Sequence, residues 1–122
     1  KMQILYCWHD VEGFSKFGSY EGNGNANGPF VYLGFKPALV IVKNIDSTES
    51  WAIYDNKRNP FNPLTLGLYA DSAAVENSAS GRYKDFLSNG FKIRGNSGEQ
   101  NSSHTFVYMA WAEMPFKYAR AR

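Results

Sequence analysis

Three side chains able to bind a metal ion or transfer a proton stand together near the start of the chain. His9, Asp10 and Glu12 directly follow an apolar run. Successive residues of a strand point to opposite faces, so His9 and Asp10 can reach one ion only if a turn intervenes. A solvated turn explains the same residues without a ligand. We therefore predict no metal site here.

The other patterns that carry chemistry do not occur. Residues 22–28 read GNGNANG, which fits neither the phosphate loop nor the dinucleotide fingerprint. No Gly-x-Ser-x-Gly nucleophile elbow is found, and His104 has no acidic residue close by in sequence. A nucleophile, a base and an orienting group can assemble from distant positions, but the sequence offers no candidate set. We expect no enzyme, no catalytic residue and no cofactor. Four aspartates are spaced as turn residues, without a calcium-loop pattern: Asp46, Asp55, Asp71 and Asp85.

Aromatic rings and loop amides suggest a second function, the binding of a cell-surface sugar. Trp51 and Trp111 lie in apolar strand patterns and are expected in the core, whereas Tyr83 stands between Arg82 and Lys84 and is expected at the surface. Residues 56–62 and 95–103 are predicted to form one outward tip. The candidate ligand contacts are Tyr83, Asn56, Asn59, Asn62, Asn96 and Asn101.

Composition limits the remaining classes. The chain has 122 residues, enough for one domain, with 16% aromatic and 20% charged residues. Its net charge is only +2, and the one basic cluster comprises Lys117, Arg120 and Arg122. That cluster is expected to be a solvated tail, so we expect no nucleic-acid partner. No apolar run reaches the length of a membrane span. Cys7 is the single cysteine and is expected to be a small buried side chain.

Short strand patterns separated by turns run along the chain. Residues 85–94 (DFLSNGFKIR) predict a hairpin, because Asn89 and Gly90 accept the positive φ values of a type I′ turn. Residues 71–79 fit either a short helix capped by Asp71 or a loop. The pattern predicts an all-β fold, an antiparallel, jelly-roll-like β-sandwich of eight or nine short strands with little or no helix. The remaining strands are predicted at residues 3–8, 16–21, 30–33, 38–43, 50–54, 64–69 and 105–112.

The two ends of the chain resemble each other. Residues 6–14 (YCWHDVEGF) align without gaps on residues 108–116 (YMAWAEMPF), with Tyr and Phe matching at the ends. A repeat array would explain this. We interpret residues 1–16 as the closing strand and linker of a preceding unit, and residues 17–122 as the sandwich domain. The first segment must pair with something, because an open apolar strand edge is a liability. We expect it on this domain's own sheet edge, with a neighbouring chain as the alternative.

Two predicted strands are apolar on both faces, around Val40 and around Tyr108. One face of a sandwich sheet packs in the core, whereas the other usually meets water. Either a long loop covers the second face, or it contacts another subunit or repeat. The candidate assembly residues are Val40, Val42, Tyr6, Trp8, Met109 and Trp111.

Several stretches resemble a domain common in virion proteins of marine bacteriophages. They are residues 13–24 (GFSKFGSYEGNG), 28–38 (GPFVYLGFKPA), 51–55 (WAIYD), 85–92 (DFLSNGFK) and 108–117 (YMAWAEMPFK). In that family the domain often stands at the C-terminal end of tail-fibre-like or other structural proteins, and two units often follow one another. The resemblance carries no catalytic residues. It implies a virion location and a structural role in the particle, such as a tail fibre.

The expected partners follow from these observations. A structural particle protein would contact itself or other virion proteins, as a homo-oligomer or a repeat array. A fibre tip would bind a host cell-surface glycan.

Overall fold

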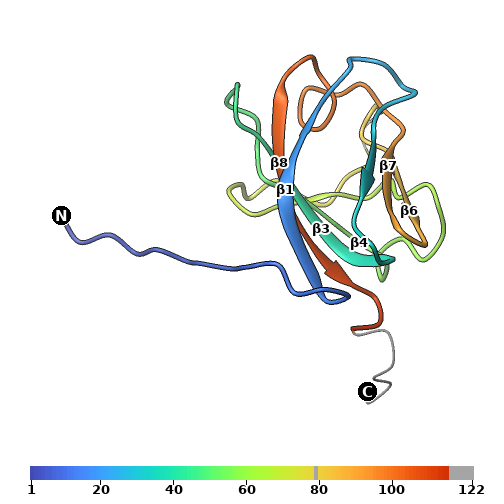
Figure 1. Ribbon diagram of the computed structural model, residues 1–122. Coiled ribbons are helices and arrows are strands. Elements are labelled where there is room, and N and C mark those ends of the chain that lie inside the picture. Colours follow the sequence, from blue (N-terminus) through green and yellow to red (C-terminus); the bar gives the residue numbers. More distant parts are fainter. Residues whose placement is uncertain (79, 116–122) are drawn as a thin grey trace.

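The computed structural model describes residues 1–78 and 80–115 as a two-layered β-sandwich (Figure 1). The eight strands form two antiparallel sheets, and no helix occurs in the described residues, which confirms the predicted all-β sandwich. It follows that no helix in this part of the chain could cross a membrane. The basic cluster of Lys117, Arg120 and Arg122 lies outside the described residues.

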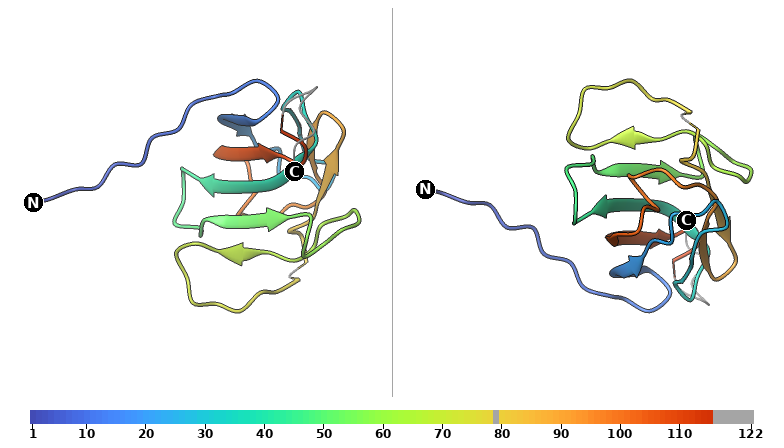
Figure 2. Two further views of the ribbon diagram at one scale, coloured as in Figure 1. Left: turned by 90° about the horizontal axis from the view of Figure 1, so that it is seen from below. Right: turned by 90° about the horizontal axis from the view of Figure 1, so that it is seen from above.

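The larger sheet has five strands, with the last strand inserted between the first and the third. In spatial order they are β1 (Ser15–Glu21), β8 (Thr105–Ala112), β3 (Pro37–Asn44), β4 (Ala52–Asp55) and β5 (Leu68–Tyr69). The smaller sheet has three strands, in the order β2 (Phe30–Tyr32), β7 (Gly90–Ile93) and β6 (Lys84–Leu87). Figure 2 shows the small sheet packed on one face of the large one.

The core lies between the two sheets, and alternation along each strand decides which side chains enter it. On β8, Phe106, Tyr108 and Ala110 are buried, whereas the intervening residues are only partly buried. The rings of Tyr20 and Phe106 stack with centroids 5.2 Å apart. Phe91 of the small sheet meets Tyr108 edge to face at 5.7 Å. Aromatic packing of this kind binds the two layers together.

The predicted hairpin is present, but its turn differs from the expectation. Leu87 pairs with Gly90, so the two loop residues are Ser88 and Asn89 rather than Asn89 and Gly90. Gly90 is the first residue of β7, and a Cβ atom there would lie 2.1 Å from the carbonyl oxygen of Val31. Glycine is therefore needed because β2 approaches closely, and not because the turn needs a positive φ.

The segment before β1 departs from its prediction. Residues 1–10 contain no strand and extend away from the body (Figures 1 and 2). The expectation that residues 3–8 pair with this domain's own sheet edge is therefore wrong. Cys7 is exposed, not buried. Residues 71–78 follow the loop alternative, with Asn77 bridging to Gly67.

Candidate functional site

The two loops predicted to form one tip lie at opposite ends of the large sheet. Residues 56–62 follow Asp55, which pairs with Leu39 near the start of β3. Residues 95–103 precede Thr105, which pairs with Glu21 at the end of β1. Because neighbouring strands run antiparallel, these two positions are at opposite ends. The prediction of a single tip is wrong.

The loop of residues 95–103 is fastened from within. Asn101 is fully buried, and its Nδ2 atom donates to the carbonyl oxygens of Gly95 at 2.8 Å and Asn25 at 2.6 Å. Its Oδ1 atom accepts the backbone N–H of Asn23 at 2.9 Å. Asn101 therefore ties two loops together and cannot contact a ligand, which corrects the prediction. Asn96 is exposed and Tyr83 partly exposed, so both stay predicted contacts.

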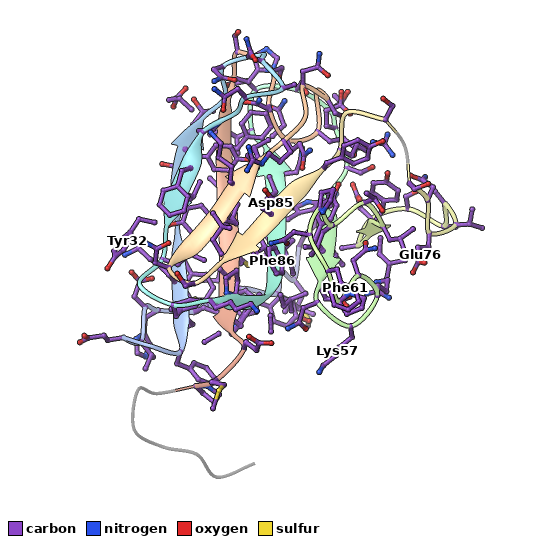
Figure 3. All side chains as sticks on the ribbon, turned by 90° about the vertical axis from the view of Figure 1, so that its right-hand side faces the viewer. Tyr32, Lys57, Phe61, Glu76, Asp85 and Phe86 are labelled. Carbon is purple, nitrogen blue, oxygen red and sulfur yellow. The ribbon has the colours of Figure 1, made fainter. Side chains whose placement is uncertain are left out.

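A cleft of about 370 Å³ opens beside the other loop. Phe61 is its most exposed ring, with 82% of its surface accessible. Figure 3 shows Phe61 and Lys57 at the same end of the molecule. The sequence pattern missed Phe61, although the turn-forming residues on both sides of it signal an exposed ring. The cleft is lined by Lys36, Asn56, Lys57, Asn59, Pro60, Phe61, Asn62, Leu64, Phe86 and Glu113.

The three predicted asparagines of this loop meet at the cleft but do not have equal freedom. Asn62 bonds both backbone groups of Phe86, at 2.9 Å each. Asn59 accepts the N–H groups of Thr65 and Leu66 through its Oδ1 atom. Asn56 donates to Glu113 at 3.1 Å, whereas its Oδ1 atom has no hydrogen-bond partner among the described residues. That oxygen is itself buried, so a ligand can bond it only if the residues around it move.

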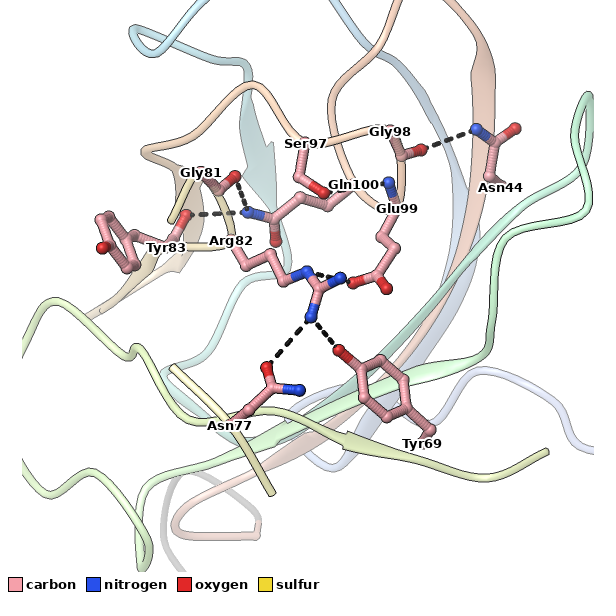
Figure 4. Close-up of polar contacts among 10 residues, drawn as sticks. All are labelled: Asn44, Tyr69, Asn77, Gly81, Arg82, Tyr83, Ser97, Gly98, Glu99 and Gln100. Atoms are coloured by element: carbon pink, nitrogen blue, oxygen red, sulfur yellow. Dashed lines mark hydrogen bonds and ion pairs between the residues drawn. The ribbon is translucent and has the colours of Figure 1, made fainter. Parts of the chain in front are cut away.

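A second polar cluster lies under the loop of residues 95–103, between the sheets (Figure 4). The Nε atom of Arg82 is 2.9 Å from the Glu99 carboxylate. Its terminal nitrogen donates to Asn77 at 3.0 Å and to the Tyr69 hydroxyl. Burial raises the pKa of Glu99, and the Arg82 charge partly offsets that effect. Gln100 donates to the carbonyl oxygens of Gly81 and Tyr83, so the cluster fixes the loop to the segment just before β6.

Lys84 is the unexpected member of this region, since the sequence placed it beside a surface tyrosine. It is fully buried, and its Nζ atom lies 3.6 Å from the centroid of the Tyr54 ring. Burial lowers the pKa of Lys84 from 10.5 to about 7, and the Glu99 carboxylate partly offsets this. An uncharged amine is a nucleophile. No substrate can reach an amine with no exposed surface, however, so Lys84 is a structural residue in this conformation.

No metal centre emerges from these clusters. Within residues 1–78 and 80–115, no group of three or more His, Cys, Asp or Glu side chains could hold an ion. His9 bonds the carbonyl oxygen of Asp10 through its ring, in an exposed position. His104 contacts Ser102 and Asn44, which makes it part of the loop structure.

The predicted assembly residues divide between the two faces of the large sheet. Val40 and Val42 are fully buried in the core, so neither can contact a partner, which corrects that part of the prediction. Met109 and Trp111 point the other way and are partly exposed, as are Leu39 and Ile41. We call the residues on this side the outer face: Phe17, Leu39, Ile41, Ile53, Leu68, Val107, Met109 and Trp111.

A chain of rings joins the N-terminal segment to the outer face. Tyr6 stacks on Trp8 with centroids 6.2 Å apart, and Trp8 stacks on Phe17 at 6.4 Å. Phe17 then meets Trp111 edge to face at 5.6 Å. Tyr6 and Trp8 remain 72% and 56% exposed. The predicted residues Tyr6, Trp8, Met109 and Trp111 thus form one partly solvated apolar surface, with Phe17 as the link that the sequence did not indicate.

A comparison with known protein families finds a match for this chain. The family described as "Domain of unknown function (DUF7483)" matches residues 1–115. No curated protein and no solved structure matches the chain. The matched region includes the extended residues 1–10 together with the whole sandwich, so both are part of the family's sequence pattern.

Proposed function

The chain belongs to the DUF7483 family, a domain family of unknown function, and we propose that it is a structural domain of a phage particle. It acts by assembly and surface contact, without catalysis, in a tail fibre or another appendage of the virion. The partners are further copies of itself or other virion proteins. The sequence resemblance supports the phage context, and the geometry of the large sheet supports the assembly role.

The outer face is the observation that carries this proposal. The small sheet packs against the opposite side, and the described loops leave the outer-face side chains partly exposed. Apolar patches on the surface of a domain mark sites of contact with other proteins. Because the exposed rings of Tyr6 and Trp8 continue the same surface, the apolar area reaches beyond the sheet itself.

Electron microscopy of particles tests the proposal. Gold-labelled antibodies against this chain should bind an appendage of the phage that encodes it, at a regular position on each particle. Label that is found only in lysed cells and never on purified particles would contradict the virion role. A parallel micrograph of the purified chain should show ordered oligomers rather than single domains.

The cleft beside Phe61 favours a second candidate, a receptor- or carbohydrate-binding module at a fibre tip. An exposed ring and the Lys36–Glu113 pair, with 3.4 Å between nitrogen and oxygen, line one cleft. Sugars offer an apolar face for a ring and hydroxyl groups for polar side chains. The cleft alone does not select a particular glycan.

A glycan array distinguishes this candidate. The labelled wild-type chain should bind a defined glycan, and the Phe61→Ala variant should lose at least about tenfold in affinity, since that corresponds to about 1.4 kcal/mol. Thr48→Ala, in an exposed loop at the opposite end of the sheet, is the matched control and should bind as the wild type does. Absence of any glycan binding, or equal binding by both variants, would remove the sugar-binding role.

A further inference from the structure

The outer strand of the large sheet has an open edge. Even-numbered residues of β1 bond to β8, as shown by Gly22 donating to His104 and Ala112 donating to Phe14. Odd-numbered residues therefore direct their N–H and C=O groups away from β8. In the described part of the chain, no residue bonds these outward groups of Ser19 and Glu21. One half of β1 is thus free to accept another strand.

The chain's own N-terminal segment pairs with only the first residue of this edge. Val11 and Ser15 exchange both backbone hydrogen bonds, at 3.1 Å and 2.9 Å, which is the first step of a hairpin. The next pair would be His9 with Phe17. The Asp10 carboxylate instead accepts the Phe17 N–H at 2.8 Å, and the His9 carbonyl oxygen accepts the Ser15 hydroxyl at 3.3 Å. These two bonds take the place of the His9–Phe17 backbone pair, and residues 1–8 do not continue along β1.

Residues 2–8 have the pattern of a strand that has not found its partner. Met2, Ile4, Tyr6 and Trp8 are apolar at every second position and all exposed. Leu5 and Cys7 between them are also exposed and apolar, so an extended segment presents apolar side chains on both faces. If the hairpin register continued, Cys7 would lie opposite Ser19, and Trp8 and Tyr6 would lie opposite Gly18 and Tyr20 on the core side.

A cleft lies beside the start of β1. It has a volume of about 350 Å³ and is lined by Lys16 of β1, by Tyr32 of β2 and by the chain's own Asp10, Glu12 and Gly13. Tyr32 is 63% exposed, and Phe30 on the same strand is also exposed. An added strand would place Trp8 and Tyr6 opposite Gly18 and Tyr20 and would so lengthen the aromatic core around Tyr20.

We propose that residues 4–8 of one copy add as an antiparallel edge strand to β1 of a second copy, with Cys7 opposite Ser19. The occupant is this chain's own segment, supplied in trans because Asp10 prevents it from pairing in cis. Strand addition satisfies the open backbone groups of Ser19 and Glu21 and buries the exposed rings. Exchange of identical segments is a low-cost route to a dimer. This inference names the partner within the proposed assembly role.

Disulfide capture tests the register directly. Ser19→Cys is exposed on the edge strand and places a thiol opposite Cys7 of the partner. Equal amounts of ¹⁴N and ¹⁵N protein are mixed, oxidised with copper phenanthroline and digested for mass spectrometry. We expect mixed-isotope peptide pairs that join Cys7 to the new thiol at position 19. Thr48→Cys, at an exposed loop position between β3 and β4, is the control and should give no such pair.

The cross-linking pattern distinguishes exchange between copies from pairing within one chain. Mixed-isotope pairs at position 19 support the exchange, and Ser19→Pro, which removes the outward N–H, should then weaken association at least about tenfold while Ser19→Ala does not. A cross-link found only within single chains would show that the segment pairs in cis and would overturn the proposal, as would the absence of any pair. The test uses purified protein, so particles that fail to bind antibody would leave this result unaffected.

Discussion

The two faces of the large sheet use the same strands for opposite purposes. On β3, Val42 is fully buried, whereas its neighbour Ile41 is partly exposed and equally apolar. On β8, Phe106 and Val107 differ in the same way. The inner side chains determine whether the domain folds. The outer ones add little to the core, and their apolar character supports the proposed contact with another protein.

Truncation on β8 gives the largest expected difference between the faces. Phe106→Ala removes a fully buried ring that stacks on Tyr20 and should cost about 3–5 kcal/mol of unfolding free energy. Val107→Ala, one residue along on the outer face, should cost no more than about 1 kcal/mol. Urea denaturation of both variants measures the difference. Equal losses would mean that the outer face is a second core.

The buried Lys84 gives the opposite expectation for the inner face, because replacing this residue should stabilise the domain. Its amine is buried without a hydrogen-bond partner, so Lys84→Met should raise the unfolding free energy at pH 7 by roughly 3–4 kcal/mol. The pKa of Lys84 is 10.5 in the unfolded chain and about 7 in the folded chain, so between these pH values the unfolded chain binds the extra proton. The wild type should therefore gain stability as the pH rises from 7 to about 9.5, by about 1.4 kcal/mol per unit.

The same pH series contains the control for the Lys84 prediction and the result that would contradict it. Burial raises the pKa of Tyr20 and Tyr54, which lowers stability where unfolded tyrosines ionise, so the series ends below about pH 10. Lys57→Met, at an exposed loop position, should keep the wild-type slope. A flat profile in the wild type would show that Lys84 keeps its proton when folded.

The two ends of the sheet give a smaller difference. Asn101→Ala leaves backbone groups of two loops unpaired and should cost about 1–3 kcal/mol. Asn96→Ala, on an exposed side chain of the same loop, should change stability by no more than about 0.5 kcal/mol. Thermal unfolding distinguishes the two. Equal melting temperatures for the two variants would show that Asn101 does not hold the two loops together.

The sequence predicted the strands well because their signal is local. Alternating or continuous apolar residues located β1, β3, β4 and β8 to within two residues at each end. The pattern does not show which side of an apolar strand faces the core, and the expectation that Val40 lies at an interface is therefore wrong. That choice depends on where the small sheet packs, a contact between distant residues.

The candidate sites were harder to predict for the same reason. Asn56 and Asn101 look alike in sequence, both in polar loops, but only the structure shows that Asn101 is enclosed by residues 23–25 and Gly95. The buried amine of Lys84 carries no local signal, because a lysine on a strand usually faces solvent. Residues 3–8 carry a strand pattern, but the Asp10 carboxylate accepts the Phe17 N–H that a continued hairpin would use, and no local signal in the sequence indicates this bond.

A substitution on the outer face should have a small effect on stability and a large consequence for assembly. Ile41→Lys should change the unfolding free energy by no more than about 1 kcal/mol, because the lysine stem can lie on the surface with its charge in water. It should still prevent contact through this face, since a buried unpaired charge is costly. Lys57→Ala serves as the matched surface control.

Sedimentation velocity over a range of concentrations tests the central claim most directly. The wild type should shift from a 13.8 kDa species to larger ones as its concentration rises, and Ile41→Lys should remain at 13.8 kDa or stop at the dimer formed by strand exchange. A wild type that sediments as a monomer at every concentration would contradict the assembly role.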